Sequence, residues 1–259
     1  MPDPLAPLLG RTLVLAAHPD DEAVGCGVLL QRVTEPHVAY LTDGAPLDRY
    51  FWKDYGSREE YAAQRRGEAG AACALVGGTA HFCDVTDQRL FRELERAQAW
   101  LDLLVARLRP HAIVAPAFEG GHPDHDAVNL LASIAGAHTG AAAWEYPCYH
   151  RSVDGALVRQ EFRTAAGNEV VLTPAPAEWD RKLRMYGAYA SQREVLQHFL
   201  AQGERFRPLA AYDYAAPPHA GVLNYEAWQW GITGSEVAEA FAAHRRRFRT
   251  TTGASSYSH

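Results

Sequence analysis

The chain has 259 residues, 47% of them hydrophobic, which suits one large α/β domain and argues against disorder. Its formal net charge of -6 comes from 25 Lys and Arg against 31 Asp and Glu, so nucleic acid is not an expected partner. The start is too short and proline-rich for a signal peptide, no apolar run is long enough for a membrane span, and the four cysteines form no CxxC pair, so we expect reduced thiols in a cytoplasmic protein.

The first half of the chain alternates short apolar runs with segments of helical spacing. In chain order we expect a strand at 12–17, a helix at 22–33, a strand at 37–42, a helix at 59–76, a strand at 79–83, a helix at 90–108, a strand at 111–118, a helix at 126–137 and a strand at 141–146. Such alternation predicts an α/β fold with a Rossmann-like, doubly wound, mostly parallel sheet.

The alternation ends after Pro147. We expect a β-hairpin from 158–164 and 169–173 around AAGN, helices at 177–190 and 192–202, a Pro- and Tyr-rich stretch at 205–230 and a last helix at 235–247. We therefore predict a Rossmann-like catalytic core at 1–150, a hairpin and helical part at 151–250 that completes the same domain, and a flexible tail at 251–259.

An unusual cluster, His18-Pro19-Asp20-Asp21-Glu22, follows the first strand. A helix start explains a single acidic residue there, but it does not explain His18. A dinucleotide site fits poorly, because the glycines follow the acidic residues and a pyrophosphate would meet two carboxylates. A divalent cation removes the repulsion, and imidazole with carboxylate suits zinc.

His18 and Asp21 supply only two ligands, and a catalytic zinc usually takes three from the protein. A second cluster, from Gly120 to Asp126, follows the fourth strand and contains His122, Asp124 and His125. In a doubly wound sheet these two strands flank the switch point, so both clusters are expected side by side.

The stretches AAHPDDE and GGHPDHDAV resemble the LmbE-like/PIG-L family of zinc-dependent N-deacetylases. Similar features extend to YLTDGA at 40–45, RRGEAGAACALVG at 65–77 and TDQRL at 86–90. The resemblance covers residues 12–150, is weaker at 182–192, and does not reach 195–259.

The resemblance implies roles for six residues. His18, Asp21 and His125 would be the zinc ligands, with Fe(II) as the alternative metal. Asp20 would be the general base, and His122 would lie beside the developing oxyanion, with Asp124 orienting and charging it. Glu22 and Asp126 are better explained as helix-start residues, or for Glu22 as a partner of a ligand histidine.

Substrate contacts are less specific in the sequence. By resemblance Arg65 and Asp87 are candidates for sugar hydroxyls, although Arg65 equally fits a solvated helix face. Tyr146, together with Tyr149 and His150, follows the fifth strand and is a candidate for the acceptor sugar, or for packing. The Trp- and Tyr-rich stretch at 206–230 fits a stacking wall, a subunit contact or plain packing.

The implied activity is metal-dependent hydrolysis of an N-acyl amide, foremost N-acetyl, on a small amino-sugar conjugate. The alternatives are an amidase on a thiol conjugate, an N-acyl glycopeptide or a non-sugar amide, or a non-catalytic sugar- or nucleotide-binding domain. Neither nucleic acid nor a membrane is an expected partner, and the frequent multimers of the family leave a homo-oligomer open.

Overall fold

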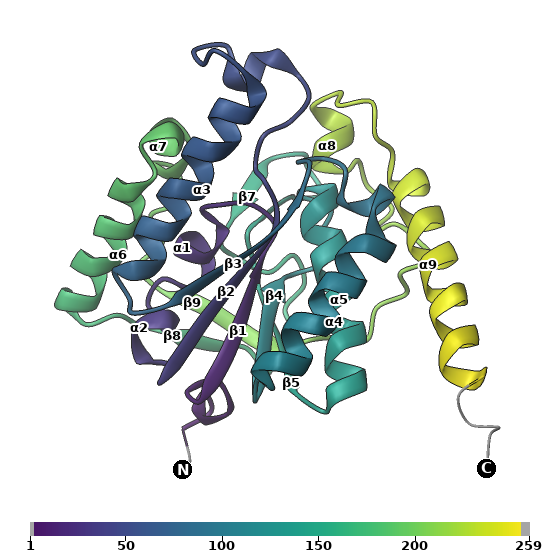
Figure 1. Ribbon diagram of the computed structural model, residues 1–259, viewed down its shortest axis with the longest axis horizontal. Coiled ribbons are helices and arrows are strands. Elements are labelled where there is room, and N and C mark those ends of the chain that lie inside the picture. The colour runs from purple at the N-terminus through teal and green to yellow at the C-terminus, as the bar shows by residue number, and fades with distance from the viewer. Residues whose placement is uncertain (1–2, 255–259) are drawn as a thin grey trace.

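The computed structural model describes residues 3–254 of the chain (Figure 1). The strands are β1 (Arg11–Ala16), β2 (Glu35–Thr42), β3 (Thr79–Val85), β4 (Ala112–Pro116), β5 (Ala142–Tyr146), β6 (Tyr149–Arg151), β7 (Leu157–Arg159), β8 (Val170–Leu172) and β9 (Glu204–Pro208). The α-helices are α1 (Asp21–Cys26), α2 (Leu29–Arg32), α3 (Arg58–Ala74), α4 (Leu94–Leu108), α5 (Pro123–Thr139), α6 (Pro176–Ala188), α7 (Arg193–Leu196), α8 (Asn224–Ala227) and α9 (Gly234–Ala254). Short 3₁₀ turns lie at η1 (Ala6–Leu8), η2 (Arg49–Trp52), η3 (Leu90–Arg92) and η4 (Ala190–Gln192).

The central sheet has seven strands in the order β3-β2-β1-β4-β5-β9-β8. The first five are parallel, β9 runs antiparallel to β5, and β8 runs antiparallel to β9. The order reverses between β1 and β4, which is the switch point of a doubly wound sheet. The predicted fold class is therefore confirmed.

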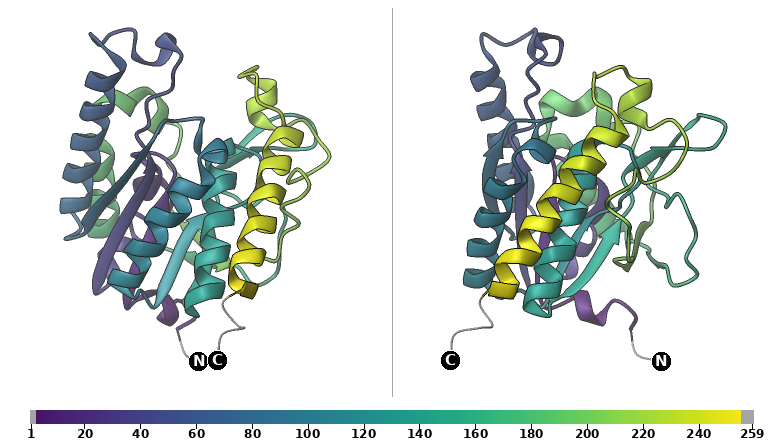
Figure 2. Two further views of the ribbon diagram at one scale, coloured as in Figure 1. Left: turned by 45° about the vertical axis from the view of Figure 1, so that its right-hand side comes forward. Right: turned by 90° about the vertical axis from the view of Figure 1, so that its right-hand side faces the viewer.

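Helices cover both faces of the sheet (Figure 2). Side chains alternate along a strand, and on β1 Leu13 and Leu15 enter one core whereas Val14 and Ala16 enter the other. The first core packs against α4, α5 and α9, and the second against α1, α2, α3 and α6. The central strands β1 and β4 are buried on both sides, which explains why they appear in the sequence as continuous apolar runs.

The single helix expected at 22–33 is two short helices, α1 and α2. The carboxylate of Glu204 accepts the backbone N–H groups of Val28 and Leu29 at 2.7 and 2.9 Å. The buried Lys182 ammonium lies 2.6 Å from the same carboxylate and donates to the carbonyl oxygen of Val24 at 2.9 Å. A remote ion pair thus satisfies the backbone groups that a continuous helix would pair internally.

The predicted hairpin of 158–164 with 169–173 was wrong in its pairing. β7 pairs with β6, and β8 pairs with β9 at the edge of the central sheet. Gln160, directly after β7, has φ of 56°, and its backbone N–H donates to the carbonyl oxygen of Cys148 at 2.8 Å. The chain turns away at this residue, so the AAGN stretch joins strands of different sheets.

The helix expected at 192–202 ends at Leu196, and strand β9 lies within the stretch that we expected to be irregular. Two side chains bind the backbone after α7: Tyr186 donates its hydroxyl to the carbonyl of Phe199 at 2.7 Å, and Gln160 accepts the N–H of Ala201 at 3.1 Å. These contacts replace the hydrogen bonds of a longer helix.

Three other features bear on the sequence predictions. The four cysteines are free and buried. Within residues 3–254, no helix combines the length and the hydrophobicity that a bilayer crossing needs. Helix α9 continues to Ala254, so the expected tail at 251–259 begins inside a helix, and its residues 255–259 lie outside the described part of the chain.

Candidate metal centre and active site

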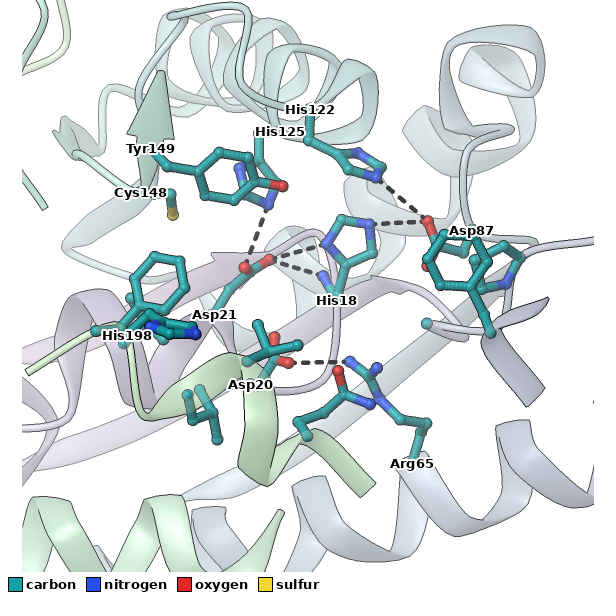
Figure 3. A pocket seen from close by; sticks show the side chains of 18 of the residues that line it. His18, Asp20, Asp21, Arg65, Asp87, His122, His125, Cys148, Tyr149 and His198 are labelled. Atoms are coloured by element: carbon teal, nitrogen blue, oxygen red, sulfur yellow. Dashed lines mark hydrogen bonds and ion pairs between the residues drawn. The ribbon is translucent and has the colours of Figure 1, made fainter. Parts of the chain in front are cut away.

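Two loops meet where β1 and β4 end. The two strands are direct neighbours, and Val14 is paired with Val114 near their carboxyl ends. The 17–20 loop leaves β1 and the 117–122 loop leaves β4, so both open onto the same edge of the sheet. Figure 3 shows the imidazoles of His18, His122 and His125 turned toward one another across this edge.

The turn between β1 and α1 is strained and closed by its own side chains. Asp20 has φ of 127°, a region that residues other than glycine rarely adopt. The carboxylate of Asp21 accepts the backbone N–H of His18 at 2.8 Å, and that of Glu22 accepts the N–H of Asp20 at 3.2 Å. Glu22 also accepts the hydroxyl of Tyr189 at 2.6 Å, so its two oxygens connect the turn to Tyr189.

The three expected ligands lie together. Nε2 of His125 is 3.2 Å from Oδ1 of Asp21, and Nδ1 of His18 is 3.5 Å from Oδ2 of the same residue. One ligand atom from each of the three lies within 4.8 Å of the others, and all three side chains are buried. Burial opposes ionisation of Asp21, but His125 and His18 outweigh it and hold the pKa of Asp21 well below its usual range.

The donor chemistry of this group fits a divalent cation. Nε2 of His125 is buried, and although Oδ1 of Asp21 lies 3.2 Å away, the two atoms are not in hydrogen-bonding geometry, whereas a buried polar atom normally has a partner. The other ring nitrogen of His18, Nε2, lies 3.1 Å from Asp87 and 3.4 Å from Asp124. A carboxylate at one nitrogen leaves the other nitrogen of the ring available to a metal.

Asp124 lies differently from our expectation. Its Oδ2 is 3.4 Å from Nε2 of His18 but 3.9 Å from Nδ1 of His122. That Nδ1 accepts the backbone N–H of Asp124 at 3.1 Å, since His122 is the N-cap of α5. Both oxygens of Asp124 are also occupied by backbone N–H groups, from Gln88 at 2.6 Å and Leu90 at 3.0 Å. Asp124 therefore supports His18 and the 88–90 segment more closely than it supports His122.

Asp87 faces both histidines. Its Oδ1 lies 3.1 Å from Nε2 of His18 and 3.5 Å from Nε2 of His122. Burial would raise the pKa of Asp87, but the charge of His18 outweighs it and lowers this pKa. Because Nδ1 of His122 accepts a hydrogen bond, the neutral ring carries its hydrogen on Nε2, on the side of Asp87.

Arg65 is a buried partner of Asp20 and not part of a solvated helix face. Its Nη2 lies 3.2 Å from Oδ2 of Asp20 and also donates to the carbonyl of Pro19. Its Nη1 donates to the hydroxyl of Tyr61 at 3.2 Å. Burial raises the pKa of Asp20 to about 7 although Arg65 opposes the rise.

Tyr146 does not reach the site, which corrects our expectation of a substrate contact. The residue is fully buried, its ring lies against Gly25, and its hydroxyl donates to the carbonyl of Leu15 at 3.1 Å. Side chains alternate along a strand, and this one points into the helical layer. Tyr149, three residues after β5 ends with Tyr146, lines the pocket instead.

The loop after β4 is fixed by residues that the sequence analysis did not single out for this purpose. Asp126 accepts the N–H groups of Glu119 and Gly120, both at 3.1 Å. Asn224 donates its backbone N–H to the carbonyl of Gly120 and its amide to that of Gly121, at 2.8 and 3.1 Å. Gly120 has φ of 70°, and a Cβ on Gly121 would lie 1.9 Å from a backbone oxygen, so both glycines are needed here.

The metal-ligand group forms one end of a cavity of about 470 Å³. Most of the acidic and basic side chains gather at this end, whereas Arg159, Glu194 and His198 line the remaining walls together with apolar and aromatic side chains. The latter are Val24, Pro46, Phe51, Tyr149, Leu157, Val195, Leu196, Phe199, Trp228 and Trp230. The sequence indicated only two parts of this lining: Tyr149, as a candidate for the acceptor sugar, and the tryptophans, through the density of Trp and Tyr at 206–230.

Comparison with known proteins agrees with this arrangement. Residues 13–135 match the family model described as PIG-L, GlcNAc-PI de-N-acetylase. This region contains all six residues expected to serve as ligands or in the chemistry, together with Arg65 and Asp87. No curated protein matches the sequence.

Several solved structures share the fold. The structure of A40926 pseudoaglycone deacetylase has a TM-score of 0.61 at 16% identity, over 78% of this chain and 99% of that one. The N,N'-diacetylchitobiose deacetylase of Pyrococcus horikoshii has a TM-score of 0.53 at 19% identity, over 77% and 83%. The 4-carboxy-2-hydroxymuconate hydratase of Pseudomonas putida has a TM-score of 0.54 at 20% identity, over 73% and 82%. At these identities the likeness shows the fold alone.

Proposed function

Because residues 13–135 belong to the PIG-L family, we propose that this protein hydrolyses an N-acyl amide, foremost N-acetyl, on an amino-sugar conjugate. The products would be a free amine and a carboxylate. The observation that carries the proposal is that one pocket contains His18, Asp21 and His125 together with Asp20 and His122.

We propose His18, Asp21 and His125 as the ligands of one divalent cation. Two imidazoles and one carboxylate are a donor set typical of catalytic zinc, and Fe(II) accepts the same set. When bound, the cation would polarise the amide carbonyl and lower the pKa of a water molecule. Asp124, 3.4 Å from Nε2 of His18, is proposed as a positioning residue for that ring.

Asp20 is the proposed general base. Its carboxylate lines the pocket next to Asp21, and Arg65 holds Oδ2 at 3.2 Å. From this position it would take the proton of the attacking water and return it to the departing amine. Arg65 would keep the carboxylate turned toward the pocket throughout both transfers.

His122 is the proposed donor to the developing oxyanion. Its Nε2–H lies on the pocket side of the ring, because Nδ1 is engaged by the backbone of its own helix. A donor fixed in a buried site stabilises negative charge on the carbonyl oxygen without reorganisation during the reaction. Asp87, 3.5 Å away, would stabilise a positive charge on this ring.

Asp87 and Arg65 remain proposed contacts for substrate hydroxyls. Nε of Arg65 is buried at the pocket and has no hydrogen-bond partner, which is costly, and a bound hydroxyl would satisfy it. Oδ1 of Asp87 lies at the pocket between the rings of His18 and His122, where it could also accept a substrate hydroxyl. The four free, buried cysteines suit a reducing compartment, so we propose the cytoplasm as the place of the reaction.

The test is product analysis on a panel of N-acetylated amino sugars, an N-acylated thiol conjugate and a non-sugar amide, with and without a chelator. We expect acetate from the amino sugars and loss of activity with the chelator. Asp20→Asn and His122→Ala should each lose about 100-fold or more in kcat with an unchanged circular dichroism spectrum. Hydration of an unsaturated acid without acetate release from any amide would contradict the proposal and favour hydratase chemistry.

A further inference from the structure

An aromatic wall of Phe51, Tyr149, Trp228 and Trp230 connects the histidines to the mouth of the pocket. The ring of Trp230 lies 4.9 Å from that of His122, and the ring of Tyr149 lies 5.3 Å from that of His125. The ring of Trp228 lies between the other two, with its centre 5.1 Å from that of Trp230 and 6.1 Å from that of Tyr149. Figure 3 shows Tyr149 in front of His125, on the side away from Asp20 and Arg65.

The outer end of this wall is exposed. Trp228 is 41% exposed and Phe51 is 37% exposed. Across the pocket, Val195 is 48% exposed and Phe199 contacts Tyr149 with a ring separation of 6.1 Å. Core packing does not explain a tryptophan that keeps two fifths of its surface in water, whereas an apolar ligand would cover it.

The two tryptophans are held in place at a conformational cost. Gln229, between them, has φ of 58°, which costs a non-glycine residue free energy. The backbone N–H of Trp230 donates to the carbonyl of Tyr225 at 3.2 Å, next to Asn224, which is bonded to the loop of His122. The segment that carries the tryptophans is thus attached directly to the loop that carries the proposed oxyanion donor.

This segment lies outside residues 13–135, the part of the chain that the family model matches. Asp87, proposed for the reacting sugar, lies 3.5 Å from Nε2 of His122, and the ring of Trp230 lies 4.9 Å from the ring of the same histidine. A substituent attached to that sugar and extending toward the mouth would therefore run along the faces of Trp228 and Trp230. Aromatic side chains favour planar, apolar partners in such a place.

We propose that the aromatic wall is a subsite for an aromatic aglycone attached to the N-acylated amino sugar. This inference rests on the proposed function, because it names the part of the substrate next to the hydrolysed group. It predicts that substrates with a planar, apolar aglycone are preferred over the same sugar with a small aglycone.

The experiment compares kcat/KM for the methyl and phenyl glycosides of N-acetylglucosamine with the metal-loaded enzyme. We expect the phenyl glycoside to be better by about tenfold, the size of effect that stacking on an aromatic side chain gives. In Trp228→Ala the ratio of the two kcat/KM values should fall to about two or less. Leu103→Ala, an exposed apolar residue at 75% exposure and outside the pocket, is the matched control and should keep the wild-type ratio.

The outcomes separate this inference from the proposed function. Equal kcat/KM for both glycosides, or an unchanged ratio in Trp228→Ala, overturns the subsite but leaves the deacetylase function. No acetate from either glycoside contradicts the function itself. A binding titration with phenyl β-glucoside, which has no amide, gives an independent result: it should quench tryptophan fluorescence in the wild type and much less in Trp228→Ala.

Two further measurements test whether something other than an aglycone covers the aromatic wall. N-octanoylglucosamine tests whether the apolar group belongs to the acyl side, and a gain there without a gain for the phenyl glycoside overturns the aglycone assignment. Light scattering tests whether a second copy of the chain covers the wall. A dimer in the wild type that dissociates in Trp228→Ala, without change in the kcat/KM ratio, also overturns the assignment.

Discussion

The guanidinium of Arg65 and the carboxylate of Asp20, 45 residues apart in the chain, form a buried pair with Nη2 3.2 Å from Oδ2. Arg65 reaches the turn from α3, and it also bonds the carbonyl of Pro19. The sequence resemblance implied that Arg65 contacts the substrate, whereas this geometry places it against the proposed base. Loss of a substrate contact should raise KM, whereas loss of the partner of Asp20 should lower kcat.

Arg65→Gln is expected to lower kcat by about tenfold or more and to leave KM within about threefold. The reason is that Asp20 loses the partner that fixes its direction, while most of the substrate contacts remain. Steady-state kinetics on an N-acetylated amino sugar measure both constants, and Arg66→Gln, at an exposed neighbour, is the control. A raised KM with unchanged kcat would show that Arg65 acts as a substrate contact alone and does not position Asp20.

The strained backbone of Asp20 predicts that the variant Asp20→Gly is more stable than Asp20→Ala. Glycine accepts φ of 127° without strain, whereas alanine does not. Both Asp20→Gly and Asp20→Ala remove the carboxylate, so both should lose activity, but the glycine variant should be more stable by about 1 kcal/mol or more. Urea unfolding of the two variants measures the difference, and equal stability would show that the turn relaxes.

Removal of a ligand should abolish metal binding. We expect about one zinc per chain in the protein as purified with zinc, and little in His125→Ala, because two protein ligands hold zinc weakly. A cation that binds only the folded state also stabilises it, by about 2.7 kcal/mol at 100 times its dissociation constant. Added zinc should therefore raise Tm in the wild type but not in the variant. Metal analysis and differential scanning fluorimetry provide the two readings, and equal metal content would exclude His125 as a ligand.

Far from the site, His81 on β3 makes folding stability depend on pH. Burial, followed by the charge of the neighbouring His37, lowers the pKa of His81 to about 4 from its ordinary value of 6.5. The unfolded chain therefore binds more protons between these two values, so this contribution to stability is complete above pH 6.5 and is lost as pH falls toward 4.

His81→Gln should flatten this part of the pH dependence, and His37→Gln should reduce it, because it removes only the second cause. The two rings are hydrogen-bonded across the strands at 3.2 Å, so both variants also lose that contact. Urea midpoints between pH 4 and pH 7.5 provide the measurement. If the urea midpoint of His81→Gln still depends on pH as steeply as that of the wild type, groups other than His81 cause the dependence.

The sequence alone determined the five parallel strands of the sheet and the meeting of the two clusters, but not the antiparallel strands β8 and β9. Strand and helix alternation predicts parallel strands, and the ends of parallel strands share one edge, so residues that follow the first and fourth strands must come close. His18, Asp21 and His125 could be grouped by this reasoning because it requires only strand order. Tyr146 could not be judged in the same way, since one position along a strand reverses the direction of the side chain.

Only the tertiary structure decided which side chains pair within that edge. It turned Asp124 toward His18, Asp87 toward both His18 and His122, and Arg65 toward Asp20. It also divided the first helix with the carboxylate of Glu204, which is about 175 residues away in the chain. The physical reason is that the spacing of apolar residues along the chain indicates only which face of a helix or strand is buried. The partner of a buried charge is instead set by packing of distant segments, which must satisfy every polar group that they remove from water.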